Sequence, residues 1–481
     1  MKKENQFPKT PTGIYGLDEI TGGGFPQGRC ILICGSAGCG KTLFATQFLV
    51  KGIVDHDIPG VFMSFEESAN DLSQNVMSLG FDLEKLKAEK KLKVDYVRIE
   101  RSEIEETGEF DLEALFIRLN YAIDSIGAKR VVLDTIESLF SGIANQTILR
   151  SEIRRLFNWL KEKGVTTIIT GERGQASLTR QGLEEYVSDC VILLDFRVID
   201  QIATRRLRIV KYRGSTHGTN EYPFLIDETG ISVIPITSLK LDYKTSTEVI
   251  STGIPALDSL FTKKGMYRGS STLITGMAGT AKTILAGYFA VSSCSRNERV
   301  LYFSFEESPE QLVRNLMSVG LNLKPFIKSK LLLIHASRPS LQGLEMHLLT
   351  LHKLLVQYKP KTVIIDPISS FSAVGNTSEV RAMLVRLMDL LKVNAINAVF
   401  TSLTNQYNNQ MIDNTVDAVS SLADTWINVK SDVTTTGRVR NLLIIKSRGM
   451  GHAMDACDFN ITSKGLVLKP TGELKTARAK K

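Results

Sequence analysis

The amino-acid sequence contains one glycine-rich motif twice, about half a chain apart. Residues 35–42 form a complete G-x-x-x-x-G-K-[ST] sequence, and residues 276–283 repeat it with Ala281 in place of the last glycine. Between a strand and a helix, this motif surrounds the phosphates of a nucleoside triphosphate with backbone N–H groups. The chain of 481 residues is therefore expected to contain two nucleotide-binding domains of similar construction.

The residues around each motif support this interpretation. A short apolar run, 30–34 or 271–275, precedes each motif, and a helical pattern, 43–50 or 284–291, follows it. Further apolar strands alternate with amphipathic helices in both halves. This alternation predicts an α/β fold in which each sheet is mainly parallel and flanked by helices.

The repeat also predicts where the chain divides. A Thr-Gly-Ile segment at residues 12–14 recurs at 252–254, near the start of the second half. A polar stretch lies just before this second copy. We expect an N-terminal domain at residues 1–240, a linker at 241–250 and a C-terminal domain at 251–481 that ends in a short basic tail.

The motif residues have predictable roles in ATP binding. Lys41 and Lys282 are expected to contact the β- and γ-phosphates, and the hydroxyls of Thr42 and Thr283 are expected to bind Mg²⁺. The methyl group of Ala281 is tolerated at a negative φ and is unfavourable at a positive one. The residues expected to bind ATP are Gly35, Ser36, Ala37, Gly38, Cys39, Gly40, Lys41, Thr42, Gly276, Met277, Ala278, Gly279, Thr280, Ala281, Lys282 and Thr283.

An aspartate ends a later apolar strand in each half. These residues are Asp134 and Asp366. An acid at this place after a P-loop typically holds Mg²⁺ directly or through water, while a strand-end acid without a ligand is the alternative interpretation. Because the pattern occurs twice, we expect both aspartates to be Mg²⁺ ligands.

Paired glutamates follow the second strand of each half. They are Glu66 and Glu67 in the first half and Glu306 and Glu307 in the second. Ligands bind at the carboxyl ends of the strands in open α/β sheets, and a carboxylate there can accept a proton from an attacking water or hydroxyl. We expect Glu66 and Glu306 to be the principal bases, with the second glutamate of each pair in support; a solvated acidic turn is the alternative.

A basic segment with the pattern K-x-R-G-x-x-H stands near the end of each half. A cation on such a late strand could reach the γ-phosphate bound by a neighbouring subunit, as an arginine finger does. An ordinary basic strand face, with the histidine in the core or a turn, is the alternative. The residues expected to contact ATP across a subunit boundary are Lys211, Arg213, His217, Lys446, Arg448 and His452.

Composition narrows the class of protein. The net charge of +8 permits binding to nucleic acid but does not require it. There is no apolar run long enough for a membrane span and no secretory signal, so a cytoplasmic location without membrane contact is expected. The six cysteines lack the paired spacing of a zinc site and are expected to be reduced and buried.

Together, the tandem P-loops, the Phe-Glu-Glu-Ser segments, the Asp-ended strands and the two basic segments resemble the KaiC family over nearly the whole chain. The resemblance implies two RecA-like domains in a two-tiered homohexamer, with ATP and Mg²⁺ at the subunit interfaces. It also implies that the N-terminal domain is an ATPase and that the C-terminal domain is an autokinase and autophosphatase acting on adjacent hydroxyl residues.

The family pattern places those hydroxyls in the second half. Two adjacent Ser/Thr residues precede an x-x-Asp-Thr step in the family, and Ser420 and Ser421 occupy that place before Asp424. The matching residues of the first half, Glu185 and Tyr186, include no serine or threonine. The resemblance therefore implies serine phosphorylation in the second half only.

The same resemblance bears on partners. It allows a KaiB-like partner protein, whereas the segment after the second domain is too short to predict regulation by KaiA. Two other functions remain open: a RecA-like ATPase that depends on nucleic acid, and a nucleotide-gated signalling scaffold. The first would need basic loops facing a channel, which the sequence does not show clearly, so nucleic-acid binding is not expected. The second would not need the glutamate pairs.

Overall fold

The structure is a computed structural model, and it describes residues 7–97, 112–140, 146–174, 178–179, 182, 187–199, 202–235, 245–341, 343–404, 419–434 and 437–468. The chain divides into two compact units, Met1–Ser238 and Leu239–Lys481. We refer to them as the first and second domains and describe each by itself. Within the described ranges, no helix has both the length and the apolar character needed to cross a membrane.

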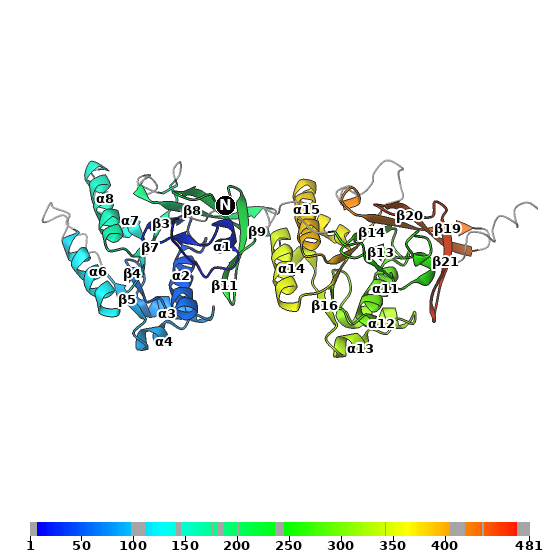
Figure 1. The fold of residues 1–481 in the computed structure, drawn as a ribbon. Helices are drawn as coiled ribbons and strands as arrows, with labels where there is room; N and C mark the ends of the chain where they lie inside the picture. The colour runs from blue at the N-terminus through cyan, green and yellow to red at the C-terminus, as the bar shows by residue number, and fades with distance from the viewer. Residues whose placement is uncertain are drawn as a thin grey trace, which may run out of the picture. The chain divides into compact units, whose positions relative to one another are not determined.

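The first domain is built on a nine-stranded sheet in the order β11-β10-β9-β8-β3-β7-β6-β4-β5 (Figure 1). The six strands from β8 to β5 are parallel, and β9, β10 and β11 are added antiparallel at one side. The elements are β1 (Lys9–Thr10), α1 (Leu17–Ile20), β2 (Phe25–Pro26), β3 (Cys30–Gly35), α2 (Lys41–His56), β4 (Gly60–Ser64), α3 (Ala69–Met77), α4 (Leu83–Ala88), β5 (Leu92–Tyr96), α6 (Glu113–Ile126), β6 (Arg130–Asp134), α7 (Ile136–Leu139), α8 (Gln146–Glu162), β7 (Thr166–Glu172), β8 (Cys190–Ile199), β9 (Ile202–Tyr212), β10 (Glu221–Asp227) and β11 (Gly230–Val233).

Helices cover both faces of this sheet. Side chains of α1 to α4 pack with Ile31, Ile33 and Phe62 on one face, and side chains of α6, α7 and α8 pack with Leu32 and Met63 on the other. Strands β3, β4 and β6 are buried along their whole length, which explains why they read as continuous apolar runs without polar alternation.

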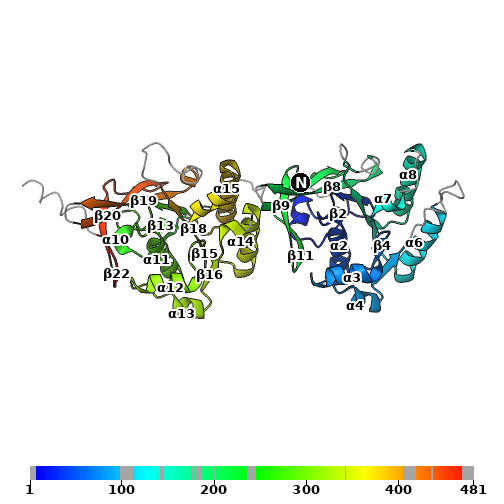
Figure 2. The ribbon, with the colours of Figure 1, turned by 180° about the vertical axis from the view of Figure 1, so that it is seen from behind.

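The second domain repeats the arrangement with the sheet order β16-β15-β17-β18-β14-β19-β20-β21-β22. Helices α10 to α13 cover one face, while α14 and α15 pack together on the other side (Figure 2). The elements are β12 (Val249–Ile250), α10 (Pro255–Asp258), β13 (Met266–Tyr267), β14 (Ser271–Gly276), α11 (Lys282–Ser295), β15 (Val300–Ser304), α12 (Pro309–Met317), α13 (Lys324–Lys328), β16 (Leu332–Ala336), η2 (Pro339–Leu341), α14 (Leu344–Tyr358), β17 (Thr362–Asp366), η3 (Ile368–Ala373), α15 (Thr377–Val393), β18 (Asn397–Leu403), β19 (Thr425–Thr434), β20 (Gly437–Ser447), β21 (Cys457–Thr462) and β22 (Gly465–Leu468).

Both sheets are mainly parallel and flanked by helices, as the sequence predicts. The last two residues of the expected linker form β12, which pairs with β13 inside the second domain. All six cysteines are buried, and none of them forms a disulfide bond. Their burial fits a protein whose thiols fill apolar space.

Candidate functional site

The first P-loop connects the end of β3 to the start of α2. Gly40, the residue before the helix, has a φ of 102°, a conformation that glycine adopts without steric cost. Lys41 is the first helical residue, and its buried Nζ donates to the carbonyl oxygens of Gly35 and Ser36 at 3.0 and 3.1 Å. The ammonium group therefore lies over the loop at the positive end of α2, where a phosphate chain is favoured.

Asp134 lies beside this loop at the end of β6. Its Oδ2 accepts a hydrogen bond of 2.9 Å from the Thr42 hydroxyl, and its Oδ1 accepts one from the Thr170 hydroxyl. Burial raises the pKa of the Asp134 carboxyl despite these two hydrogen bonds, and the charges of Glu66 and Glu67 add to the rise. A hydroxyl and a carboxylate in contact are hard oxygen donors of the kind that Mg²⁺ prefers, so these residues fit a magnesium ion.

The strand-end glutamates of the first domain have different partners. Glu66 Oε1 accepts hydrogen bonds from the hydroxyls of Thr135 and Ser138 at 2.7 and 2.6 Å. Glu67 instead accepts a longer bond of 3.4 Å from Asn75 on α3. Because two hydroxyls fix its position, Glu66 is the carboxylate held next to Asp134, which ends the neighbouring strand.

A short turn presents each glutamate pair. The Ser64 hydroxyl accepts from the N–H of Glu67 and donates to its carbonyl oxygen, at 3.1 and 2.7 Å, and Ser304 makes the same two bonds with Glu307 at 3.3 and 2.7 Å. A serine then caps the next helix through its side chain in both domains. The backbone of each turn is therefore closed by hydrogen bonds before the glutamate side chains make any contact.

The second P-loop repeats the lysine contacts of the first. Lys282 Nζ donates to the carbonyl oxygens of Gly276 and Met277 at 2.9 and 2.7 Å. Burial lowers the pKa of Lys282, while the charges of Asp366 and Glu306 oppose that shift. Lysine, aspartate and glutamate thus lie close enough to interact at the carboxyl edge of the second sheet.

The aspartate of the second domain has a partner that the first lacks. Asp366 Oδ2 accepts a hydrogen bond of 2.7 Å from the Tyr302 hydroxyl, and Oδ1 accepts one from Thr401, the counterpart of Thr170. Burial raises the pKa of the Tyr302 phenol well above its usual range, and Asp366 adds to the rise. Among the described residues, the Thr283 hydroxyl makes no hydrogen bond comparable to that of Thr42.

The second glutamate pair also differs from the first. Glu307 Oε1 accepts a hydrogen bond of 2.9 Å from Asn315 on α12. The position of Thr135 is taken by Pro367, which has no hydroxyl, and the Glu306 carboxylate accepts no hydrogen bond from the part of the chain that the structure describes. Glu306 is exposed, so its carboxylate is accessible to solvent.

Ala281 adopts a positive φ, the less favourable of the two conformations considered from the sequence. Its φ of 82° lies in the left-handed region, as does that of Gly40 in the first loop. A Cβ in this region meets the following carbonyl oxygen, so the methyl group carries a steric cost. The second loop keeps its shape in spite of this strain.

Ala281→Gly is expected to stabilise the second domain by about 1 kcal/mol, because glycine adopts a positive φ freely. The matched variant Gly40→Ala should destabilise the first domain, since its Cβ would also lie 3.0 Å from Ile226 Cδ1. Urea unfolding can be followed in one domain at a time when the tryptophan of the other domain is replaced by phenylalanine, because Trp159 lies in α8 and Trp426 in β19. A lower midpoint for the Trp426 transition of Ala281→Gly would contradict this expectation.

The residues predicted to contact ATP across a subunit boundary lie at the edge of each sheet opposite to the P-loop. Strand β9 runs antiparallel and ends beside Cys190, the first residue of β8, and β20 ends beside Thr425, the first residue of β19. This amino edge is about 13 Å along the strands from the P-loop, for a rise of ~3.3 Å per residue. The residues that lie there are Lys211, Arg213, His217, Lys446, Arg448 and His452.

The proposed acceptor serines share the amino edge of the second sheet. Lys446 Nζ donates to the carbonyl oxygen of Ser420, and a guanidinium N–H of Arg448 donates to that of Ser421. Burial and the charge of Arg448 lower the pKa of Lys446. Ser421 is exposed and Ser420 is partly exposed, so the backbone is held while the hydroxyls stay accessible. Their first-half counterparts, Glu185 and Tyr186, lie outside the described residues.

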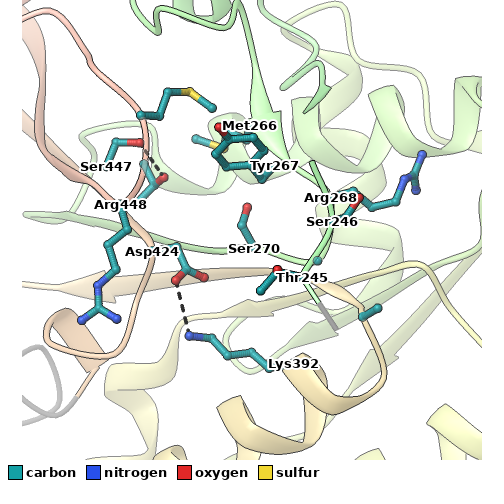
Figure 3. A pocket seen from close by; sticks show the side chains of 14 residues that line it. Thr245, Ser246, Met266, Tyr267, Arg268, Ser270, Lys392, Asp424, Ser447 and Arg448 are labelled. Carbon is teal, nitrogen blue, oxygen red and sulfur yellow. Dashed lines mark hydrogen bonds and ion pairs between the residues drawn. The ribbon is translucent and has the colours of Figure 1, made fainter. Parts of the chain in front are cut away.

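Asp424 anchors this segment to the sheet. Its Oδ2 accepts from the N–H and the hydroxyl of Ser271 at 2.9 and 2.7 Å, and Lys392 pairs with its Oδ1 at 3.4 Å. Asp424 and Lys392 border a cavity of about 230 Å³. Around it, Arg448 and Arg268 point their guanidinium groups away from the centre (Figure 3). Arg448 is therefore directed outward.

Sequence reasoning missed several side chains that touch the expected site residues. One signal for the asparagines was present, because each stands eight positions after the second glutamate of its pair in both halves. The hydroxyl donors lack such a signal, since serine, threonine and tyrosine are common in buried strands and turns. The missed residues are Asn75, Thr135, Ser138, Thr170, Tyr302, Asn315 and Thr401.

Comparison with known proteins agrees with this geometry. A family model for the KaiC ATPase matches residues 10–238 and 250–473, one match in each domain. The circadian clock protein KaiC2 of Synechocystis sp. is 55% identical over 460 residues, which cover 96% of this chain and 81% of that protein. The circadian clock oscillator protein KaiC of Synechococcus elongatus is 35% identical over 463 residues, which cover 96% and 89% of the two chains.

These matches confirm the predicted pair of RecA-like P-loop domains. They extend over both nucleotide-binding loops and over both strand-end acidic groups. The repeated sheets, the two loops with their buried lysines and the similarity along almost the whole sequence lead to one conclusion: this protein is a member of the KaiC family of ATPases.

Proposed function

We propose that this protein is an ATP-hydrolysing serine kinase that phosphorylates a second copy of itself at Ser420 and Ser421 and can also remove the phosphate. The first domain hydrolyses ATP, and the second transfers the γ-phosphoryl group. In line with the family, the working assembly is a homohexamer with nucleotides at the subunit interfaces, and a KaiB-like protein is a candidate partner.

The observation that carries this proposal is the separation of the two edges of the second sheet. The second P-loop and Glu306 lie at the carboxyl edge, and Ser420 and Ser421 lie at the amino edge, one sheet-length away. A serine cannot reach the P-loop of its own domain across that distance. Placing the amino edge of one copy against the carboxyl edge of the next brings acceptor and nucleotide together.

The side chains supply a complete route for phosphoryl transfer. Lys282 and the loop N–H groups bind the phosphates, and Glu306 accepts the proton of the acceptor hydroxyl. The serine oxygen bonds to the γ-phosphorus while the bond to the β–γ bridging oxygen breaks, and ADP leaves. Mg²⁺, held by Thr283 and Asp366, would neutralise the charge of the phosphates when bound.

In the first domain, the equivalent side chains support hydrolysis of ATP by water. Glu66 is positioned by Thr135 and Ser138 to accept a proton from water, Lys41 binds the phosphates, and Thr42 with Asp134 would hold Mg²⁺. Lys211 and Arg213 of an adjoining copy would contact the nucleotide from the amino edge. At that edge Arg213 is exposed and Lys211 is partly exposed, which supports this role.

Phosphate mapping tests the proposal. The purified protein incubated with Mg²⁺ and ATP is expected to gain phosphate on Ser420 or Ser421, located by mass spectrometry. The matched variant Ser420→Ala with Ser421→Ala should gain none in the second domain. ATP turnover stimulated by single-stranded DNA, with no phosphate on either serine, would instead favour a nucleic-acid-dependent ATPase.

A mixing experiment tests transfer between copies. Chains with both serines replaced by alanine keep the second P-loop, and chains carrying Lys282→Ala keep the acceptors. In a mixture, phosphate is expected on the Lys282→Ala chains, which cannot supply their own γ-phosphoryl group. Unphosphorylated Lys282→Ala chains in a mixed assembly would rule out transfer between copies.

A further inference from the structure

Tyr302 makes the two magnesium sites chemically different. It lies on β15 two residues before Ser304, which pairs with Asp366 on β17, and its hydroxyl reaches Asp366 Oδ2 at 2.7 Å. The tyrosine is fully buried beneath α11 among the apolar core residues. The phenol of Tyr302 therefore reaches Asp366 from the core and not from the P-loop.

The first domain has Phe62 at the same position. Phe62 lies on β4 two residues before Ser64, which pairs with Asp134 on β6. A phenyl ring has no donor, and Asp134 Oδ2 instead accepts from Thr42. In the first domain, one carboxylate oxygen thus faces the residue that is expected to bind the metal.

In the second domain, both oxygens of Asp366 are occupied from the core. Thr401 donates to Oδ1 and Tyr302 donates to Oδ2. When a metal binds, two outcomes are open to the Tyr302 bond. If the bond is kept, Asp366 offers the metal less negative charge. If it is broken, the free energy of a charge-assisted hydrogen bond opposes binding.

We propose that Tyr302 is a positioning residue that holds Asp366 away from Thr283 and so makes the second nucleotide site bind Mg²⁺ more weakly than the first. This inference rests on the proposed Mg²⁺ sites. Its consequence is that the two domains respond to different ranges of free Mg²⁺. Tyr302→Phe converts the second site to the arrangement of the first, with Thr283 free to bond to Oδ2.

Metal-directed cleavage of the full-length chain measures each site separately. Fe²⁺ bound with a non-hydrolysable ATP analogue, in the presence of ascorbate and peroxide, cuts the backbone next to the metal. Cuts near residues 42 and 134 report the first site, and cuts near residues 283 and 366 report the second. Fe²⁺ is kept well below the concentration that half-saturates either site. Added Mg²⁺ then displaces Fe²⁺, and the Mg²⁺ concentration that halves each set of fragments is the Mg²⁺ midpoint for that site.

Tyr302→Phe is expected to lower the Mg²⁺ midpoint of the second site by about ten- to a hundredfold, which corresponds to the loss of one hydrogen bond to a charged group. The first site is the internal control and should not change. Tyr288→Phe removes a different hydroxyl, on α11, that bonds to the N–H of Leu466, and it should leave both midpoints unchanged.

The outcomes separate this inference from the function on which it rests. An unchanged or raised second-site midpoint in Tyr302→Phe would overturn the role of Tyr302, and so would a changed unfolding midpoint without a changed Mg²⁺ midpoint. Second-site cleavage that persists unaltered in Asp366→Asn would instead overturn the assignment of Asp366 as a metal ligand.

Discussion

Glu306→Gln is expected to abolish phosphate incorporation at Ser420 and Ser421. The glutamine side chain has the same size but cannot accept a proton, so the acceptor hydroxyl loses its base. Removal of a general base slows a reaction by about 10²- to 10⁴-fold. Because the carboxylate is exposed and accepts no hydrogen bond from the described residues, its substitution should leave the surrounding turn intact. Time courses of phosphate incorporation measure the effect.

Glu66→Gln is the matched control for this result. It should slow ATP hydrolysis by the first domain and leave the transfer machinery of the second domain in place. ATP turnover and serine phosphorylation, measured on the same samples, therefore ought to respond to different glutamates. Wild-type phosphorylation by the Glu306→Gln protein would show that another group accepts the proton.

Lys41→Ala is expected to lower ATP turnover by roughly 10²-fold, as found when a preorganised charge partner of the transition state is removed. The buried ammonium lies over the loop and bonds to Gly35 and Ser36, so alanine leaves these carbonyl oxygens without their donor and the phosphates without their cation. Steady-state release of inorganic phosphate measures the loss. Assembly should also weaken if nucleotides join the subunits, which sedimentation can detect.

Lys282→Ala provides the comparison in the second domain. It should remove serine phosphorylation but spare most of the turnover, because hydrolysis is assigned to the first domain. Unchanged turnover in the Lys41→Ala protein would refute the assignment of hydrolysis to the first P-loop. Equal losses in the two lysine variants would mean that both domains hydrolyse ATP at similar rates.

The sequence was sufficient to predict the parts of the site that depend on neighbouring residues in the chain. A short apolar strand, a glycine-rich loop and a helix follow one another in the sequence, so β3 with α2 and β14 with α11 could be recognised directly. The aspartates at the ends of β6 and β17 could be recognised because each ends an apolar strand. Repetition in both halves strengthened every one of these predictions.

The parts that depend on sheet order could not be predicted in the same way. Tyr302 and Asp366 are 64 positions apart and meet only because β15 lies next to β17. A tyrosine in an apolar run looks like any other core residue until that pairing is known. The φ of Ala281 was also open, since an alanine by itself favours a negative φ and only the fixed loop geometry imposes a positive one.

The serine-closed turns before α3 and α12 have a consequence for how such enzymes diversify. The hydroxyl of Ser64 or Ser304 closes each turn by bonding to the backbone of the second glutamate of the pair, whatever the glutamate carboxylates contact. The residues around the site can therefore differ between the two domains while the turn is kept. Thr135 of the first domain corresponds to Pro367 of the second, and Phe62 corresponds to Tyr302. Two duplicated domains can in this way come to differ in reaction rate while they keep the same fold.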